Sequence, residues 1–297
     1  MRLLNLDGRL QVSTASGLVD VAAASRGHFS SGPQDVYDRW EEFVAWCETS
    51  AGDLTPTDTG DLDPVRLGAP SPRPRQVFAV GLNYADHAAE AGIARPETPV
   101  IFTKFASAIS GPVTTVSLPP GSVDWEVELV VVIGRGGRGI PAARAWDAVA
   151  GLSVGQDLSE RRGQMSGPVP QFSLAKSHRG FAPIGPALVT IDELDNPDDL
   201  DLGATINGEV VQRSRTSQMI FSVPDLVAYL SRTVELCPGD VLFTGTPPGV
   251  GVGRTPPRFL GPGDVLRSHV EGIGELVQTF TGPDETLLVP DRMREAG

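Results

Sequence analysis

Residues 124–134 read "DWEVELVVVIG", and this stretch joins alternating acids to a wholly apolar run. Asp124, Glu126 and Glu128 alternate with apolar residues, so on a strand the three acids would share one side, each about 7 Å from the next. Like charges at that spacing repel one another, and they lead into what is typical of a buried strand. A divalent cation held by Glu126 and Glu128 would offset the repulsion. The alternative is the exposed face of an edge strand, with the acids solvated.

A third acid from another strand would complete a metal site and leave positions open for water and substrate. Asp157 is the best candidate, because it ends the apolar run "AVAGLSVGQD". The sequence therefore predicts a metal site built from Glu126, Glu128 and Asp157.

The composition excludes several classes of protein. The chain has 297 residues, of which 40% are hydrophobic, enough for one large domain and a small one. The 34 Gly and 26 Pro separate many short apolar runs, which predicts a turn-rich, mainly β fold. A formal net charge of -13 argues against nucleic acid and anionic membranes as general partners.

Cysteine usage and the N-terminus indicate the compartment. Cys47 and Cys237 form no C-x-x-C pair and no zinc-ligand spacing, which is typical of buried thiols in a reducing environment. The start "MRLLNLDGRL" lacks the apolar stretch of a signal peptide, and no run is long enough to span a bilayer. We therefore expect a soluble cytoplasmic protein.

The first 70 residues are predicted to form a small N-terminal domain. Asp7-Gly8 between two apolar runs indicates a hairpin, and the spacing of apolar residues predicts a helix over 33–48. Residues 49–75 lose this periodicity and collect five prolines, which indicates a linker. The predicted domains are residues 1–70 and 71–297.

The larger domain is predicted to alternate strands with a few helices. Strand-like segments lie at 76–81, 100–104, 127–133, 151–157 and 186–190, and Asn207-Gly208 indicates a second hairpin. The segment "YADHAAEAG" predicts a short helix that ends on Gly92, and "SVPDLVAYLSR" has helical spacing.

Two further groups of residues indicate catalysis. On a helix, His87 and Glu90 share one face, and a carboxylate bonded to one imidazole nitrogen makes the other more basic, as in a water-activating base. Lys176 is one of only two lysines among 24 basic residues, and in an extended segment it would face the same way as His178. The alternatives are a surface His–Glu pair and a rim lysine without a role.

Six segments together resemble the fumarylacetoacetate hydrolase family, in the order in which that family carries them over residues 76 to about 280. They are "GLNYADHAAEAG", "DWEVELVVVIG", "KSHRGFAPIGP", "INGEVVQ", "MIFSVPDLVAYLS" and "PGDVLFTGTPPGVG". The resemblance implies an α+β fold, with a mixed, partly rolled β-sheet carrying the site at one mouth and a small N-terminal α/β domain. It also implies a homodimer.

The resemblance assigns roles position by position. It implies one Mg²⁺ or Mn²⁺ per subunit on Glu126, Glu128 and Asp157, and a water-activating dyad of His87 and Glu90 on a mobile lid. Lys176 matches the active-site lysine of the family. Thr246 and Lys104 match positions at or near the substrate pocket. Gln156, His178 and Arg179 depart from the residues that many members carry, so they would alter the pocket and its substrate.

The implied chemistry is cleavage of a carbon–carbon bond in a 1,3-dicarbonyl or 2-oxo acid, such as an acylpyruvate or a fumarylacetoacetate-like compound. His87 would activate water, and Lys176 would hold the developing negative charge. An oxaloacetate-type decarboxylase or a 2-hydroxydienoate isomerase or tautomerase would use the same metal chemistry without attack by water. A catalytically inactive small-molecule binding protein is the alternative of another class.

Overall fold

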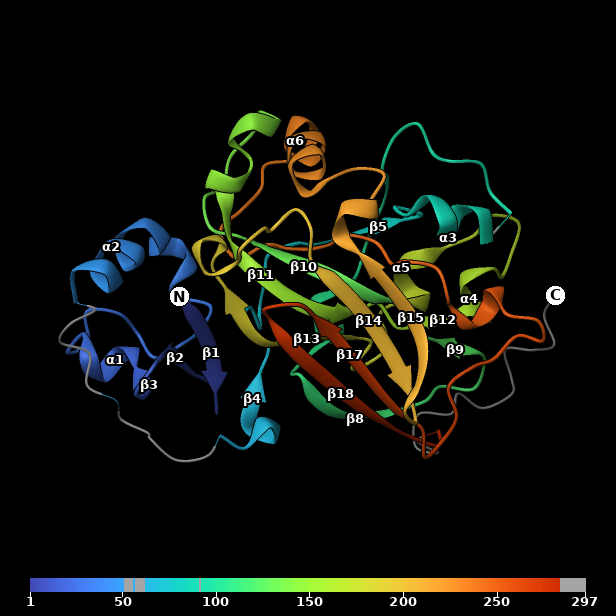
Figure 1. The fold of residues 1–297 in the computed structure, drawn as a ribbon, viewed down its shortest axis with the longest axis horizontal. Helices are drawn as coiled ribbons and strands as arrows, with labels where there is room; N and C mark the ends of the chain where they lie inside the picture. The colour runs from blue at the N-terminus through green and yellow to red at the C-terminus, as the bar shows by residue number, and fades with distance from the viewer. Residues whose placement is uncertain (51–55, 57–61, 91, 284–297) are drawn as a thin grey trace.

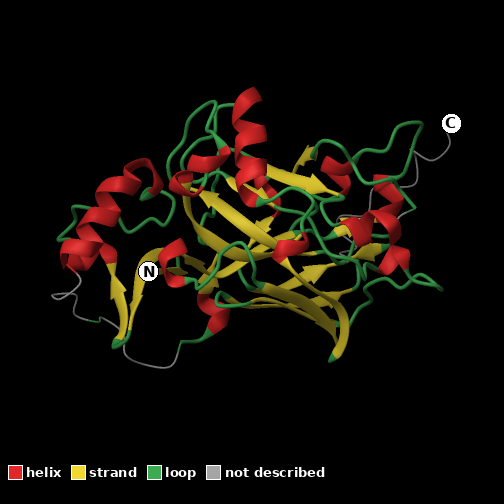
Figure 2. Cartoon of the chain, turned by 45° about the horizontal axis from the view of Figure 1, so that its top comes forward, coloured by secondary structure: helices red, strands yellow, loops and turns green. Residues whose placement is uncertain are grey.

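The computed structural model describes residues 1–50, 56, 62–90 and 92–283 of the chain. Two large β-sheets occupy its centre and short helices lie around them (Figure 1, Figure 2). The predicted mainly β, α+β fold is therefore confirmed. The predicted linker over 49–75 falls largely on residues 51–55 and 57–61, which lie outside the described residues.

The larger sheet contains eleven strands, and its main path runs β3-β2-β1-β13-β11-β10-β16-β5-β6, with β4 paired to β1 and β7 to β13. Its strands are β1 (Arg2–Leu6), β2 (Arg9–Thr14), β3 (Gly17–Asp20), β4 (Leu67–Gly68), β5 (Val77–Gly81), β6 (Val100–Thr103), β7 (Ile109–Ser110), β10 (Val127–Ile133), β11 (Val149–Gln156), β13 (Ala182–Val189) and β16 (Val241–Phe243). The pairs β5–β16 and β7–β13 are parallel, while the other pairs are antiparallel, so the sheet is mixed.

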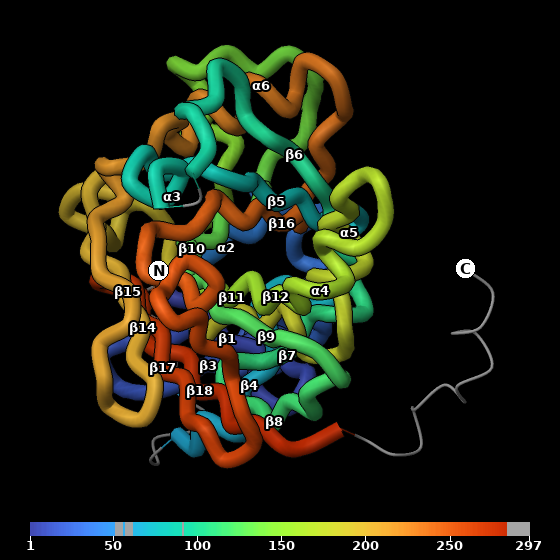
Figure 3. The backbone as a smooth tube through the Cα atoms, turned by 90° about the vertical axis from the view of Figure 1, so that its right-hand side faces the viewer, coloured from blue at the N-terminus to red at the C-terminus, as the bar shows by residue number. Residues whose placement is uncertain are grey.

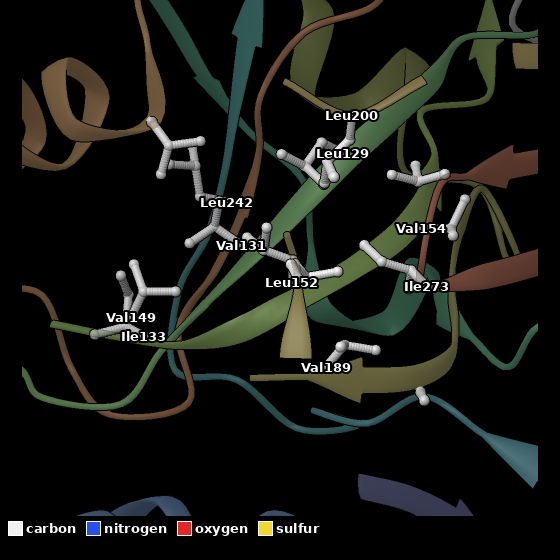
Figure 4. Packing of buried hydrophobic residues seen from close by; sticks show 14 of the residues in the cluster. Leu129, Val131, Ile133, Val149, Leu152, Val154, Val189, Leu200, Leu242 and Ile273 are labelled. Atoms are coloured by element: carbon white, nitrogen blue, oxygen red, sulfur yellow. The ribbon is translucent and has the colours of Figure 1, made fainter. Parts of the chain in front are cut away.

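The residues of β10 that follow Glu128 are all apolar, because both faces of this strand are buried. Leu129, Val131 and Ile133 join one apolar cluster, together with residues of β11 and β16, as Figure 4 shows. Val130 and Val132 point to the other face and join a second cluster. Since side chains alternate along a strand, a run that is apolar on both faces is what a central strand between two clusters requires.

A second, five-stranded sheet packs on the first and has the order β15-β14-β17-β18-β8. Its strands are β8 (Val113–Ser117), β14 (Asp201–Ile206), β15 (Glu209–Arg215), β17 (Val265–Val270) and β18 (Gly274–Thr281). A two-stranded ladder joins β9 (Val123–Asp124) to β12 (Ser159–Glu160). The predicted hairpin at Asn207-Gly208 connects β14 and β15, with φ values of 53° and 86° at its two turn residues.

Within the described residues, six α-helices lie at the periphery of the sheets. They are α1 (Val21–Ala24), α2 (Trp40–Ser50), α3 (Ala85–Glu90), α4 (Arg161–Gln164), α5 (Phe172–Ala175) and α6 (Val223–Thr233). Single 3₁₀ turns are η1 (Tyr37–Arg39), η2 (Pro64–Arg66), η3 (Ala106–Ala108), η4 (Ala142–Arg144), η5 (Trp146–Ala148), η6 (Ile191–Glu193), η7 (Thr216–Gln218) and η8 (Gly251–Gly253). No helix within the described ranges is long and apolar enough to cross a membrane.

The predicted helices at α3 and α6 are confirmed, whereas the predicted start of the helix at residue 33 is wrong. α6 begins with a capping box between Ser222 and Asp225. The earlier helix begins at Trp40, after η1. The Gln34 side chain accepts hydrogen bonds from Ser71 Oγ and the Arg73 amide, so the residues before Trp40 are held by the chain around residue 72.

The first strands belong to the same sheet as the rest of the chain. The predicted hairpin at Asp7-Gly8 is confirmed, and β1 pairs with β13 through Arg2↔Val189 and Leu3↔Leu188. In Figure 1 the segment with α1, α2 and β1–β3 lies at the left of the molecule. The sheet thus continues across residue 70, and the division into two domains stays a prediction.

The opposite side of the molecule carries α3, α4 and α5. Figure 3 looks onto this side, with α3 on one flank and the α4–α5 segment on the other, and with the labels of β10, β11 and β12 between them. α4 and α5 contact each other, and α5 also contacts the edge strand β6. The side chains predicted to be catalytic come from the elements at this end.

Candidate metal centre and active site

Three carboxylates meet where β10 begins and β11 ends. β10 and β11 are antiparallel with Val127 opposite Gln156, and the Asp157 amide donates to the Glu126 carbonyl at 2.9 Å. This register brings Glu126, Glu128 and Asp157 together, with one oxygen of each within 4.8 Å of the others. The predicted cluster is formed. Its members are only 5%, 1% and 1% exposed, so the alternative of a solvated edge strand is wrong.

Asp124 does not share a face with the other two acids, contrary to the prediction. β9 ends at Asp124 and β10 begins at Val127, so the strand is interrupted between them. The Asp124 carboxylate accepts from the Gly251 and Val252 amides at 2.7 and 3.0 Å, and from Arg161 Nε at 2.8 Å. The interruption turns this acid away from the cluster and toward a loop and an arginine.

Two buried lysines and an arginine neutralise part of the cluster. Lys176 Nζ lies 2.6 Å from Glu126 Oε2 and 2.8 Å from Asp157 Oδ2. Lys104 Nζ lies 2.5 Å from Asp157 Oδ1 and also donates to the Lys176 carbonyl. Arg161 Nη2 lies 2.7 Å from Glu126 Oε1. These contacts leave Glu126 and Asp157 well paired.

Glu128 differs from the other two acids in its partners. Its Oε2 accepts from the Gly245 amide at 2.7 Å, and in the described part of the chain no ion pair reaches it. Burial, and then the charges of Asp157 and Glu126, raise the pKa of Glu128 well above its usual range. Burial alone would also raise the pKa of Glu126, but Lys176, Arg161 and His87 together lower it. One carboxyl of the cluster is therefore left short of positive charge.

The donor set fits a hard divalent cation. Four buried acids, which are Asp124 and the three of the cluster, face three cations, which are Lys104, Arg161 and Lys176. With all seven of these groups ionised, the set carries one negative charge in excess, while burial lowers the pKa of Lys104 and raises that of Glu128. Carboxylate oxygens are the ligands that Mg²⁺ and Mn²⁺ prefer. With such an ion bound, the group would carry one net positive charge, which favours an anionic substrate.

Metal affinity is expected to rise with pH and to level off above the raised pKa of Glu128. The ligand must be ionised, so binding releases its proton, and affinity should change about tenfold per pH unit below that pKa. Calorimetric titration with Mn²⁺ in two buffers of different ionisation enthalpy would count the released protons. A flat affinity profile without proton release would contradict the assignment of Glu128.

His87 and Glu90 come together on α3. His87 is 8% exposed, and its Nδ1 lies 3.2 Å from Glu90 Oε2. The Gly249 amide donates to both Glu90 oxygens, at 3.0 and 3.2 Å. Gly92, with φ 69°, follows the helix as predicted. The carboxylate is therefore held from two sides, and its contact with Nδ1 leaves Nε2 available for proton transfer.

The local conformation at Lys176 differs from the extended segment that was predicted. Lys176 caps the C-terminus of α5, with φ -105° and ψ 11°. Its ammonium points into the cluster, whereas His178 and Arg179 are exposed. Lys176 and His178 therefore do not face the same way, because the helical turn rotates the two side chains apart. Burial alone would lower the pKa of Lys176, but Asp157 and Glu126 raise it, so this residue is a cation and not a base.

The positions predicted to bind substrate have different surroundings. The Thr246 hydroxyl donates to the Val127 carbonyl at 2.9 Å and accepts from Gln212 Nε2 at 2.8 Å. The Lys104 side chain is 0% exposed and contacts a metal-site acid and a backbone carbonyl. These contacts position β10 and Asp157. Substrate binding by Thr246, Lys104, His178 and Arg179 stays a prediction.

Sequence reasoning did not find Arg161, Gln164 and Tyr84. Arg161 follows Asp157 by four residues, and its Nη1 donates to Gln164 Oε1 at 3.0 Å. The available signal is the segment "ERRGQ" after the third acid, but arginine is so common in this chain that an arginine at this position does not by itself indicate a site. The Tyr84 ring is 1% exposed, and its buried hydroxyl has no hydrogen-bond partner among the described residues.

Comparison with known proteins finds matches in both sequence and fold. Residues 76–281 match the family model described as Fumarylacetoacetate (FAA) hydrolase C-terminal. Human oxaloacetate tautomerase FAHD2A, mitochondrial, is 49% identical over 211 residues, which cover 70% of this chain and 67% of that protein.

Two solved structures share the fold over almost the whole chain. A putative HpcE protein from Mycobacterium smegmatis is 63% identical with a TM-score of 0.90, covering 96% of this chain and 100% of that one. Maleylpyruvate hydrolase from Sphingobium sp. SYK-6, in complex with manganese (II) ion and pyruvate, is 26% identical with a TM-score of 0.78, again covering 96% and 100%.

The matched segment contains the three clustered acids at the end of the β10–β11 pair, the His87–Glu90 pair on α3, and Lys176 at the end of α5. The six sequence motifs, the fold and the buried acidic cluster therefore lead to one conclusion. The chain belongs to the fumarylacetoacetate hydrolase family.

Proposed function

We propose that this chain is a divalent-metal-dependent enzyme that interconverts the enol and keto forms of an oxaloacetate-type 2-oxo acid. The observation that carries the proposal is the buried acidic cluster, which together with Asp124 and its three cations lacks one positive charge when Glu128 is ionised, and whose Glu126 senses the charge of His87. A 2-oxo acid offers adjacent oxygens and a negative charge, both of which suit this site. The 49% identical oxaloacetate tautomerase supports tautomerisation over other reactions.

The chain's own residues supply the proton transfer. With Nδ1–H donated to Glu90, His87 can accept a proton at Nε2 and return it to another atom of the substrate. Lys176 remains protonated and stabilises negative charge that develops on a substrate oxygen. A Mg²⁺ or Mn²⁺ ion held by Glu126, Glu128 and Asp157 would supply Lewis acidity. Burial of these groups excludes water, which strengthens each electrostatic contact.

Hydrolysis of a carbon–carbon bond in an acylpyruvate or related 1,3-dicarbonyl is the second candidate. The same His87–Glu90 pair could activate a water molecule, and the 26% identical maleylpyruvate hydrolase shares the fold. In this case His87 Nε2 takes a proton from water, and Lys176 stabilises the oxygen of the attacked carbonyl. The two reactions need the same side chains but give different products.

Product analysis with Mg²⁺ or Mn²⁺ tests the proposal. Tautomerisation leaves the mass unchanged and removes the ultraviolet absorbance of the enol, hydrolysis adds the elements of water, and decarboxylation loses carbon dioxide. Metal binding without turnover of oxaloacetate or of any dicarbonyl would favour the inactive binding protein. The homodimer and the cytoplasmic location stay predictions, which light scattering and cell fractionation would check.

His87→Ala is expected to lower kcat by about 10²- to 10⁴-fold, because it removes the group that moves the proton. Affinity for Mn²⁺ should stay within a few-fold of wild type, since His87 is not one of the clustered acids. Steady-state kinetics and calorimetry measure the two effects. The matched control is His269→Ala, because His269 is an exposed residue that pairs with Asp201 at 3.1 Å. Unchanged turnover in His87→Ala would reject the assigned base.

A further inference from the structure

Asp124, the buried acid that lies outside the metal-site cluster, makes an unusual set of contacts. Asp124 is 0% exposed and accepts four hydrogen bonds, from the Trp125, Gly251 and Val252 amides and from Arg161 Nε. Three of these distances are 2.7–2.8 Å, as expected for charge-assisted bonds to a carboxylate. A single buried charge thus joins the loop that contains η8 to the arginine that contacts Glu126.

The same loop holds the carboxylate of the His87–Glu90 pair. Gly249 donates its amide to Glu90, and its carbonyl accepts from Trp125 Nε1 at 3.2 Å. Gly253 lies so close to Glu90 that a Cβ placed there would be 2.6 Å from Glu90 Cγ. A Cβ at Gly251 would lie 2.7 Å from Asp124 Oδ1. The loop is therefore packed between Asp124 on one side and Glu90 on the other.

We propose that Asp124 is a positioning residue that sets the geometry of the His87–Glu90 pair and of Arg161 at the same time. Through the Gly251 and Val252 amides it holds the loop whose Gly249 amide orients Glu90, and Glu90 orients His87. Through Arg161 it holds the guanidinium against Glu126. The inference deepens the proposed function, and it rests on the assignment of His87 as the proton-transferring group.

A substitution that keeps the shape of Asp124 tests this role. In Asp124→Asn, one side of the side chain still accepts hydrogen bonds, but the other presents an amide that donates. That amide would face either the Val252 amide and Arg161 Nε, or the Trp125 and Gly251 amides, so donors would oppose donors. Whichever way the new amide is oriented, it therefore opposes one of the two loop amides, Gly251 or Val252, and in one orientation it also opposes Arg161 Nε.

At saturating Mn²⁺, Asp124→Asn is expected to lower kcat about 10- to 100-fold, as for other groups that orient a reacting side chain. Mn²⁺-binding stoichiometry counts the folded sites, so kcat refers to those alone. Backbone hydrogen exchange gives a readout that does not depend on activity. We expect faster exchange in peptides covering 84–90 and 249–252, with exchange in 127–133 unchanged.

Asp240→Asn is the matched control. Asp240 is also 0% exposed and accepts from the Gln76 and Cys237 amides, but it lies outside the site. The Asp240→Asn variant should lose protection from hydrogen exchange near residues 76 and 237. It should keep wild-type kcat per folded site and wild-type exchange over 84–90. If Asp124→Asn does not fold, the smaller Asp124→Ser removes the carboxylate that accepts from the Gly251 and Val252 amides and from Arg161 Nε, and should accelerate exchange in the same two peptides.

The outcomes separate this inference from the proposed function. Wild-type exchange at 84–90 and 249–252 in the folded variants would overturn the role of Asp124, whatever the reaction is. A wild-type protein that turns over no 2-oxo acid would reject the proposed function. In that case, faster exchange at both segments in Asp124→Asn would still support the connection between the loop and the His87–Glu90 pair.

Discussion

Glu128→Gln is expected to abolish metal binding and to lower turnover roughly 1,000-fold, on the order of 4 kcal/mol of lost transition-state stabilisation, while the metal-free fold remains intact. A neutral amide is a poor ligand for a hard dication. The fold survives because Glu128 has no ion-pair partner to leave behind among the described residues, and the glutamine carbonyl can accept from the Gly245 amide. Mn²⁺ calorimetry, kinetics and thermal unfolding measure the three quantities.

The sign of the stability change depends on pH. Because folding raises the pKa of Glu128, its contribution to the free energy of unfolding is complete below the unfolded pKa and is lost as pH rises through the folded pKa. Glutamine does not titrate. Without metal, the variant should therefore become progressively more stable than wild type as pH rises. A variant less stable than wild type at every pH would contradict this description, and Glu209→Gln, at an exposed pair with Arg258, is the control.

Lys176→Met is also expected to lose turnover, but unlike Glu128→Gln it should retain metal binding and have a fold that depends on metal. Removing one partner of a buried ion pair leaves Glu126 and Asp157 short of positive charge, which destabilises the metal-free protein by about 3–5 kcal/mol. Loss of a cation that stabilises developing charge lowers kcat by about 10²- to 10³-fold. Thermal unfolding with Mn²⁺ and with a chelator gives the stability effect.

Added Mn²⁺ should restore more stability to Lys176→Met than to wild type, because the dication replaces the missing positive charge. A ligand at ~100 times its dissociation constant adds about 2.7 kcal/mol to the free energy of unfolding. Arg267→Met removes an exposed pair with Glu275 and should change stability by less than about 1 kcal/mol. Equal stabilisation of Lys176→Met and wild type by Mn²⁺ would show that the ammonium does not offset the acidic cluster.

The elements that were predicted correctly depend on neighbours in the sequence. Asp7-Gly8 and Asn207-Gly208 form hairpins because these residues adopt positive φ readily. α6 begins at a capping box formed by residues three apart. The acidic cluster was predicted because repulsion between Glu126 and Glu128 requires a counter-charge, which is a local argument.

The elements that were missed depend on distant contacts. The helix predicted from residue 33 starts at Trp40, because Gln34 bonds to residues near 72. Asp124 was expected beside Glu126, yet it bonds to Gly251, which lies 127 positions away. The role of Arg161 depends on the fold, which places its guanidinium between Asp124 and Glu126.

By itself the sequence determined the two hairpin turns, the central strand at 127–133, the helices at α3 and α6, the family, and which acids would need a cation, since these follow from local conformation and from charges close together along the chain. Only the tertiary structure decided that Lys104 and Lys176 neutralise Asp157, that Glu128 is left without such a partner in the described chain, and that Asp124 holds the loop beside Glu90. The reason is that burial and Coulomb energy depend on separation in space.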